Sequence, residues 1–156
     1  MAIKVGDRIP SVTLKGTDMQ DVSADDLFKG KVVLFAVPGA FTPTCSAKHL
    51  PGFIEKAGEI KAKGVDRIVC LSVNDAFVMD AWGKDRGAGD AVILVADGSG
   101  DFTRAIGLEM DGTKFGMGVR SQRYAAVIED GVVKHLAVEE PMQFEVSSAE
   151  AILGAL

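Results

Sequence analysis

Three runs of mainly apolar residues constrain the fold of this 156-residue chain more than any other feature. They cover residues 31–38 (KVVLFAVP), 66–73 (DRIVCLSV) and 91–97 (AVILVAD), and each is rich in residues that favour strands. Such runs are typical of strands buried on both faces of a sheet. Between the first two runs, apolar residues recur every three or four positions from Ala47 to Ile60. This spacing predicts one face of a helix, which Pro51 should kink.

The rest of the chain supplies further short elements and a hairpin. Asp130-Gly131, between two β-rich segments, predicts a hairpin over residues 123–139. We also expect a strand at 11–16, helices at 23–30, 74–87 and 99–107, and a C-terminal helix, with Ser23 and Asn74 as N-caps and Ser147 with Glu150 as a capping box. This order predicts one α/β domain over residues 1–156, with a mixed central sheet and helices on both faces.

The composition narrows the classes of function. Hydrophobic residues make up 47% of the chain, the net charge is -5 and no basic run occurs, so nucleic acid is not an expected partner. No apolar run approaches a membrane span, and the first residues lack the apolar core of a secretory signal. Two cysteines do not make a disulfide scaffold, and with two histidines they lack the spacing of a zinc site. We therefore expect a cytoplasmic protein without a bound metal.

One cysteine lies where a predicted strand turns into a predicted helix, within VPGAFTPTCSAKHL (residues 37–50). Pro38 ends the strand, Thr42 is a suitable N-cap, and Pro43 is a suitable first helical residue. Cys45 is then the third residue of the helix, where unpaired backbone N–H groups and the helix dipole favour a thiolate. The pattern indicates a nucleophilic cysteine with a threonine hydroxyl within one helical turn of its sulfur.

The spacing Pro38-x-x-x-Thr42-x-x-Cys45 resembles the active-site signature of the peroxiredoxins. Two further blocks, CLSVNDAFVMDAW and RSQRYAAVIEDGVV, are similar to the type II, or peroxiredoxin-5-like, subfamily, and the blocks are spread through residues 31–138. The resemblance implies a thioredoxin-like fold. It also implies that a cysteine reduces hydrogen peroxide and organic hydroperoxides, without metal, haem or another cofactor.

The resemblance assigns roles to individual residues. It implies that Cys45 is the peroxidatic cysteine, that Thr42 hydrogen-bonds the peroxide, and that Pro38 shields the thiolate from water. Arg123, in RSQRYA, matches the arginine that faces the sulfur. A fixed positive charge there would favour the thiolate and help to hold the peroxide oxygens. Arg120, three residues earlier, is a weaker candidate for that position.

Cys70 has two interpretations. It lies in the apolar segment RIVCLSV, where a cysteine often serves as a small buried hydrophobic residue. Its spacing of 25 residues from Cys45 matches the cysteine pair of plant-like type II members, which implies that Cys70 resolves the sulfenic acid of Cys45. Other members carry a resolving cysteine near the C-terminus, where this chain has none. An external thiol is therefore the alternative.

Two more residues are candidates for the lining of the pocket. His49 lies four residues after Cys45 on the same helical face. We expect it to shape the pocket or to be exposed rather than to take part in catalysis, because a histidine is mostly neutral at neutral pH. Gly39 lies in a loop whose backbone N–H groups could stabilise negative charge on a leaving oxygen.

The leading hypothesis is a thiol peroxidase that takes its electrons from glutaredoxin with glutathione, or from thioredoxin. The alternative is a peroxide sensor or redox relay, which would use the same sulfenic acid to oxidise a partner protein. A thioredoxin-like disulfide reductase is disfavoured because the chain lacks C-x-x-C. The resemblance further implies a homodimer formed across the active-site end of the domain.

Overall fold

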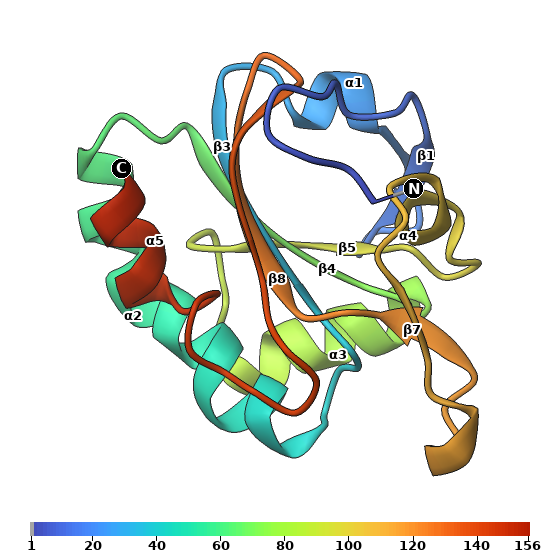
Figure 1. Ribbon diagram of the computed structural model, residues 1–156. Helices are drawn as coiled ribbons and strands as arrows, with labels where there is room; N and C mark the ends of the chain where they lie inside the picture. Colours follow the sequence, from blue (N-terminus) through green and yellow to red (C-terminus); the bar gives the residue numbers. More distant parts are fainter. Residues whose placement is uncertain (1) are drawn as a thin grey trace.

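A seven-stranded sheet forms the centre of the computed structural model, which describes residues 2–156. Its strands are β1 (Thr13–Gly16), β2 (Asp21–Ser23), β3 (Lys31–Val37), β4 (Arg67–Ser72), β5 (Ile93–Ala96), β8 (Tyr124–Glu129) and β9 (Val132–Val138). They lie in the order β2-β1-β5-β4-β3-β8-β9 (Figure 1). β3, β4 and β5 are parallel to one another, whereas the remaining neighbours pair antiparallel, so the sheet is mixed as predicted.

Helices cover both faces of this sheet, which confirms the predicted α/β architecture (Figure 1). Along β3 the side chains alternate, so that Phe35 packs into one hydrophobic cluster and Leu34 into the other. One cluster contains residues of α2 (Leu50–Ala62), α3 (Ala76–Arg86) and α5 (Ala149–Ala155), and the other contains residues of α1 (Ala24–Leu27) and α4 (Asp101–Ala105). The three apolar runs of the sequence are the three parallel strands between these layers.

The predicted N-cap Ser23 and the predicted Asp130-Gly131 hairpin are confirmed, and in both the interacting residues are close in the sequence. The hydroxyl of Ser23 accepts a hydrogen bond from Asp25 N–H at the start of α1. Asp130 and Gly131 both have positive φ, at 48° and 82°, and they join β8 to β9 in the predicted hairpin.

The predicted caps of α3 and α5 are wrong. Asp75, rather than Asn74, caps α3, because its side chain accepts from Val78 N–H at 2.8 Å. Ser148, rather than Ser147, caps α5 and accepts from Ala151 N–H at 3.1 Å. In both places neighbouring residues were suitable as caps, and the residue that was predicted makes a tertiary contact instead.

The helix that carries Cys45 is irregular in its first turns. Helical backbone begins at Pro43, as predicted, but η1 (Cys45–His49) is a π-helix, in which Leu50 N–H donates to the carbonyl of Cys45. Pro51 follows at the start of α2 and has no N–H to donate. The carbonyl of Ser46, five residues before Pro51, accepts instead from Arg86 at 3.2 Å. The predicted disturbance by Pro51 thus appears as a wide helical turn.

A two-stranded ribbon between α4 and β8 was not predicted from the sequence. Its strands are β6 (Glu109–Asp111) and β7 (Val119–Ser121), joined through a 3₁₀ turn, η2 (Thr113–Phe115). The ribbon projects from the rest of the molecule at the lower right of Figure 1. Because β7 leads directly into β8, this ribbon determines how the chain approaches Arg123.

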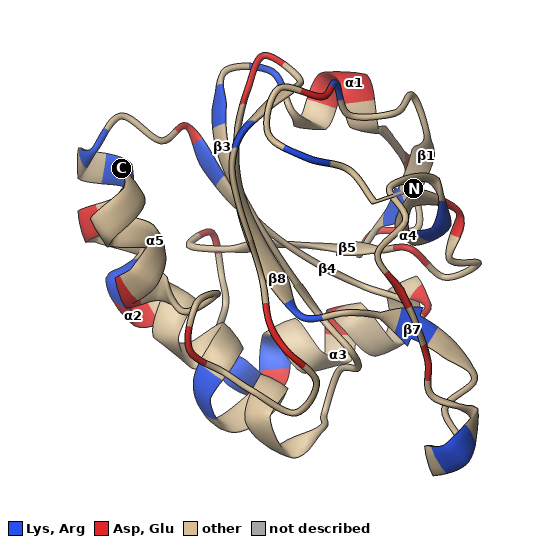
Figure 2. Cartoon of the chain, viewed as in Figure 1, with Lys and Arg blue, Asp and Glu red and all other residues tan. Residues whose placement is uncertain are grey.

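Charged residues lie mostly on helices and loops, whereas the central strands carry few of them (Figure 2). Acidic and basic residues are interspersed in this view. Over residues 2–156, none of the helices combines the length and apolar character needed to cross a bilayer. Within the same range, no three His, Cys, Asp or Glu side chains come together as a set of metal ligands.

Candidate active site

Three strand ends meet at one edge of the sheet and bring together residues that are distant in the sequence. Val37 at the end of β3 pairs with Ser72 at the end of the parallel strand β4. Ala36 pairs with Tyr124, the first residue of the antiparallel strand β8. Pro38 and Arg123 continue these strands, so both lie at this edge. The order of the strands therefore places the predicted proline and arginine beside the loop that leads to Cys45.

The loop between β3 and the helix is held by its backbone geometry and by a hydrogen bond from its own Thr42 side chain. Phe41 has a positive φ of 63°, which is unusual for a residue other than glycine and turns the chain sharply before Thr42. The Thr42 hydroxyl donates to the carbonyl of Gly39 at 2.7 Å, so it does not cap the helix as predicted. Gly39 is buried, and a Cβ there would lie 3.1 Å from Thr42 Cγ2 and 3.3 Å from Met117 Cε. The loop is therefore closely packed around Gly39.

Asn74 holds this loop from the neighbouring strand, a function that the sequence did not indicate. Its Oδ1 accepts a hydrogen bond from Ala40 N–H at 3.0 Å, and the Ser72 hydroxyl lies 2.5 Å from the same atom. Since Asn74 lies only two residues after the end of β4, its hydrogen bond ties the loop to the central sheet.

The sulfur of Cys45 lies in contact with a guanidinium group. Cys45 is fully buried, and Arg123 Nη2 donates to its Sγ at 3.0 Å. A cation at this distance favours the thiolate over the thiol. Arg120, the weaker candidate, contacts other atoms: it donates to the carbonyls of Met117 at 2.8 Å and Val73 at 3.0 Å. Arg120 thus joins the β6–β7 ribbon to the end of β4.

His49 is buried beneath Arg123, which excludes the predicted alternative of simple exposure. Its Nδ1 lies 2.7 Å from Arg123 Nη1, and its Nε2 lies 2.9 Å from the carbonyl oxygen of Ser147. Burial, followed by the positive charge of Arg123, lowers the pKa of His49 to about 3. Its ring lies 4.8 Å from that of Phe35 and 4.9 Å from that of Phe144. His49 is therefore a neutral hydrogen-bonding partner of the arginine.

Cys70 lies inside the sheet and is also fully buried. It is the register partner of Phe35 in β3 and of Leu94 in β5, so its strand is paired on both sides. Both cysteines are free thiols. Burial, and then the nearby charge of Cys45, raises the pKa of the Cys70 thiol. The two cysteines belong to the same hydrophobic cluster.

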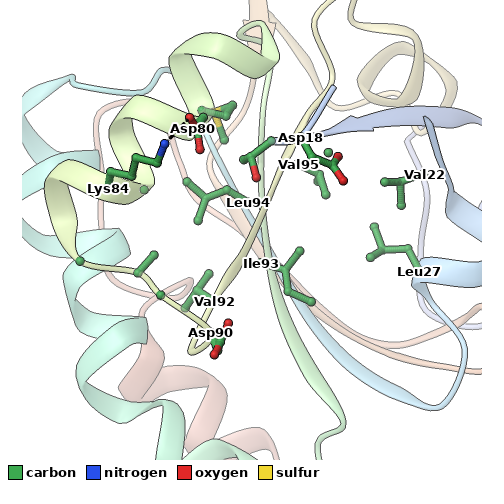
Figure 3. A pocket seen from close by; sticks show the side chains of 17 residues that line it. Asp18, Val22, Leu27, Asp80, Lys84, Asp90, Val92, Ile93, Leu94 and Val95 are labelled. Carbon is green, nitrogen blue, oxygen red and sulfur yellow. Dashed lines mark hydrogen bonds and ion pairs between the residues drawn. The ribbon is translucent and has the colours of Figure 1, made fainter. Parts of the chain in front are cut away.

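One groove of the surface is lined by none of the residues around Cys45 (Figure 3). It runs between α3, β5 and the β1–β2 hairpin, and Asp18, Asp80, Asp90 and Lys84 are among its lining residues. Lys84 pairs with Asp80 at 2.9 Å, which reduces the net charge of the groove. The lining includes no cysteine or histidine. The groove therefore lacks a thiol like that of Cys45, which lies at the sheet edge in contact with Arg123.

Known proteins that resemble this chain include peroxiredoxins, in agreement with a reactive cysteine beside an arginine. The family described as redoxin matches residues 4–153. Peroxiredoxin-2B of Arabidopsis thaliana is 54% identical to this chain and covers 99% of it, with 98% of the relative's length matched. Peroxiredoxin-2E-2, chloroplastic, of Oryza sativa subsp. japonica is 58% identical over 99% of this chain and 72% of its own length.

Solved structures show the same similarity in three dimensions. Reduced Prx3 from Vibrio vulnificus, in complex with hydrogen peroxide, superposes with a TM-score of 0.95 at 55% identity, over 99% of each chain. Peroxiredoxin 5 from Alvinella pompejana superposes with a TM-score of 0.87 at 36% identity, over 98% of this chain and 97% of its own. These matches confirm the predicted thioredoxin-like fold. The chain belongs to the redoxin family and, within it, to the type II peroxiredoxins, which are thiol-dependent peroxidases.

Proposed function

We propose that Cys45 is the peroxidatic cysteine of this thiol peroxidase and that Arg123, Thr42 and Pro38 form its immediate surroundings. The observation that carries this proposal is the 3.0 Å contact between Arg123 Nη2 and Cys45 Sγ. Fixed positive charge beside a cysteine at the start of a helix favours the reactive thiolate. Pro38, half-buried at the end of β3, begins the loop that separates this sulfur from solvent.

The proposed chemistry is a displacement at oxygen. The Cys45 thiolate attacks one oxygen of the hydroperoxide, an S–O bond forms, and the O–O bond breaks. The leaving alkoxide or hydroxide takes up a proton and departs as alcohol or water, and the sulfur is left as a sulfenic acid. Arg123 faces the place where negative charge moves from sulfur to oxygen, so the same cation stabilises both ends of this transfer.

Thr42 is suited to orient the hydroperoxide. Its single hydroxyl proton is donated to the Gly39 carbonyl, so the oxygen is left with acceptor capacity only. A hydroperoxide O–H can donate to that oxygen. We therefore infer that Thr42 holds the protonated end of the substrate while Arg123 holds its charge.

Thr42→Val should retain the fold and slow the oxidation of Cys45 by about 100-fold, because it keeps the shape but removes a hydrogen bond made to the reacting peroxide. Thr42→Ser is the matched control, since it keeps the hydroxyl, and it should stay within a few-fold of the wild type. The measurement is the second-order rate constant of the first peroxide reaction by stopped flow. An unchanged constant for the valine variant would remove Thr42 from the peroxide site.

We further propose that Cys70 resolves the sulfenic acid in an intramolecular step, in which a Cys45–Cys70 disulfide forms and water is released. Cys70 is held in a central strand with neighbours on both sides, so the movement must come from Cys45. The π-helical segment Cys45–His49, next to Pro51, lacks the regular bonding of an α-helix and is suited to unwind locally. An external dithiol then reduces the disulfide.

Cys70→Ser should leave the first peroxide reaction within about twofold of the wild type, because the group that bonds the Cys45 sulfur is Arg123 and not Cys70. It should raise the yield of sulfinic acid at Cys45 when thiol is scarce, since an unresolved sulfenic acid can react with a second peroxide. Intact mass after one equivalent of peroxide distinguishes a disulfide, which is two hydrogen atoms lighter than the dithiol, from a sulfenic acid, which is one oxygen atom heavier. If the wild type forms no disulfide and both proteins over-oxidise alike, an external thiol is the resolving group.

A homodimer formed at the active-site end is consistent with the exposed aromatic residues there. Phe41 lies in the loop before Cys45 and is 50% exposed, and Phe77 lies in the first turn of α3 and is 69% exposed. Phe115, 67% exposed, lies on the ribbon that Arg120 joins to the end of β4. Exposed large apolar side chains that gather at one end of a domain are typical of a protein interface. We propose that they form the contact between two copies of the chain.

Membership of the family implies a peroxide substrate and a thioredoxin-type reductant. Among the reductants of this type we propose glutaredoxin with glutathione, or thioredoxin. Two free buried thiols are compatible with a reducing compartment, and we propose a cytoplasmic location. The names of the curated relatives include chloroplastic proteins as well as proteins whose names give no compartment.

A further inference from the structure

A buried carboxylate, that of Glu139, is linked to Cys45 by a series of hydrogen bonds. The series passes through Ser147, His49 and Arg123. Glu139 follows β9 and is only 7% exposed. Its Oε2 accepts three hydrogen bonds: from Glu145 N–H at 2.7 Å, from Ser147 N–H at 2.9 Å and from the Ser147 hydroxyl at 2.7 Å. Burial by itself would raise the pKa of Glu139, but the hydrogen bonds from Ser147 and Glu145 outweigh it and hold the pKa below its ordinary value. The group is therefore an ionised carboxylate held by neutral donors.

These bonds hold the segment of residues 145–147, which lies beside the start of the helix that carries Cys45. Figure 1 shows the chain before α5 passing the first turns of α2. Immediately before this segment, Phe144 lies over the site, with its ring centroid 5.8 Å from Arg123 Cζ. The backbone of Glu139 is tied to the same arginine, because Glu139 N–H donates to the Arg123 carbonyl at 2.9 Å. Glu139 therefore organises the chain on one side of Arg123.

The carbonyl of Ser147 determines the tautomer of His49. A carbonyl can only accept, so Nε2, at 2.9 Å, must carry the proton. An arginine can only donate, so Nδ1, at 2.7 Å from Arg123 Nη1, must be the acceptor. Both partners require the same neutral tautomer. His49 can thus hold the guanidinium without adding a charge.

The separation of the two charges has a chemical consequence. A carboxylate paired directly with Arg123 would compete with the Cys45 thiolate for its positive charge. Within residues 2–156, no ion pair joins Arg123 or Glu139 to an oppositely charged side chain. The carboxylate instead acts across two neutral residues. The arrangement fixes the position of the guanidinium and leaves its charge for the sulfur.

We propose that Glu139 is a positioning residue of the peroxidase site, which acts through Ser147 and His49 to hold the Arg123 guanidinium against Cys45. The inference rests on the proposed role of Cys45 and Arg123. Glu139 touches neither the peroxide nor the sulfur. It acts by orienting the carbonyl of Ser147, which in turn orients the imidazole ring of His49.

The test compares Glu139→Gln with Glu140→Gln, a matched control at the exposed neighbouring position. A neutral amide oxygen accepts weaker hydrogen bonds than a carboxylate, so Glu139→Gln should loosen Ser147. We expect it to slow the first peroxide reaction roughly tenfold and to move the thiolate absorbance titration of Cys45 to higher pH. The Glu140 variant should match the wild type in both measurements.

Nitrogen NMR of histidine-labelled protein supplies a readout that a purely structural role would not change. The chain has two histidines, so His135→Gln assigns the signals. The wild type should show His49 as the single Nε2–H tautomer, and Glu139→Gln should show a mixture of tautomers. Should Glu139→Gln fail to fold, Ser147→Ala, which removes one of the three hydrogen bonds and keeps the carbonyl, should show the same changes at smaller size.

A wild-type tautomer and a wild-type titration in the Glu139 variant would overturn the inference, even if the protein were less stable. For Ser147→Ala used in its place, the same two results would overturn it. Failure of the proposed function has a different signature: the wild type itself would not form a sulfenic acid at Cys45, or Arg123 variants would react at the wild-type rate.

Discussion

Replacing Cys45 with serine is expected to abolish peroxide reduction, leaving only the background reaction between peroxide and the thiol reductant. A serine hydroxyl stays protonated near neutral pH, even with Arg123 Nη2 placed 3.0 Å from the residue's sulfur position. No other residue in contact with Arg123 can replace the nucleophile, because His49 is neutral and bonded at both ring nitrogens. The measurement is peroxide consumption with a thioredoxin-type reductant present.

The control for this substitution is Cys70→Ser, which removes the other cysteine and should keep the first reaction. The Cys70 variant should be the less stable of the two, because its serine hydroxyl is buried within the sheet, whereas a serine at position 45 has Arg123 Nη2 beside it. Sustained peroxide consumption by the Cys45 variant would show that the nucleophile has been assigned to the wrong residue.

Arg123→Met should lower the rate of the first peroxide reaction by about 100-fold, since it removes a charged hydrogen bond to the reacting sulfur. It should also shift the ultraviolet titration of the Cys45 thiolate to higher pH. The sign follows from the charge: an adjacent cation stabilises the anionic form, so its removal makes ionisation of the thiol require a more alkaline solution. Methionine keeps the apolar first part of the side chain but removes the guanidinium that lies over the Phe144 ring.

Two other variants separate the effect of charge from that of geometry. Arg123→Lys keeps the charge but loses the planar fork that bonds Cys45 Sγ and His49 Nδ1 together, so an intermediate rate is expected. Arg104→Met removes a positive charge from α4, where Arg104 pairs with Asp101 at 3.2 Å, and should leave the rate unchanged. An equal loss in the Arg104 and Arg123 methionine variants would mean that net charge, rather than the contact, controls the reaction.

The core of the fold could be predicted because its signals are local and repeated. The apolar runs that became β3, β4 and β5 are buried on both faces, which requires continuous apolar sequence. The hairpin at Asp130-Gly131 depends on two adjacent residues that adopt positive φ. The ribbon β6–β7 was missed because its strands, Glu109–Asp111 and Val119–Ser121, are short and largely exposed, and therefore carry no apolar pattern.

The N-caps of α3 and α5 could not be predicted from neighbouring residues alone. Asn74 and Asp75 are both good caps, as are Ser147 and Ser148. Asn74 instead bonds Ala40 N–H, and Ser147 bonds Glu139. The choice between neighbouring caps was thus made by partners that lie 34 and 8 residues away in the sequence.

The sequence by itself determined the α/β class, the strand-to-helix corner and Cys45 as the candidate nucleophile, because each depends on residues within a few positions of one another. The tertiary structure decided what surrounds the sulfur. Arg123 reaches Cys45 only because β8 pairs with β3, and His49 reaches Ser147 only because the chain before α5 passes beside the helix that carries Cys45. Glu139 carries no motif, and its place in this network depends on hydrogen bonds that exist only once the strands and helices have packed.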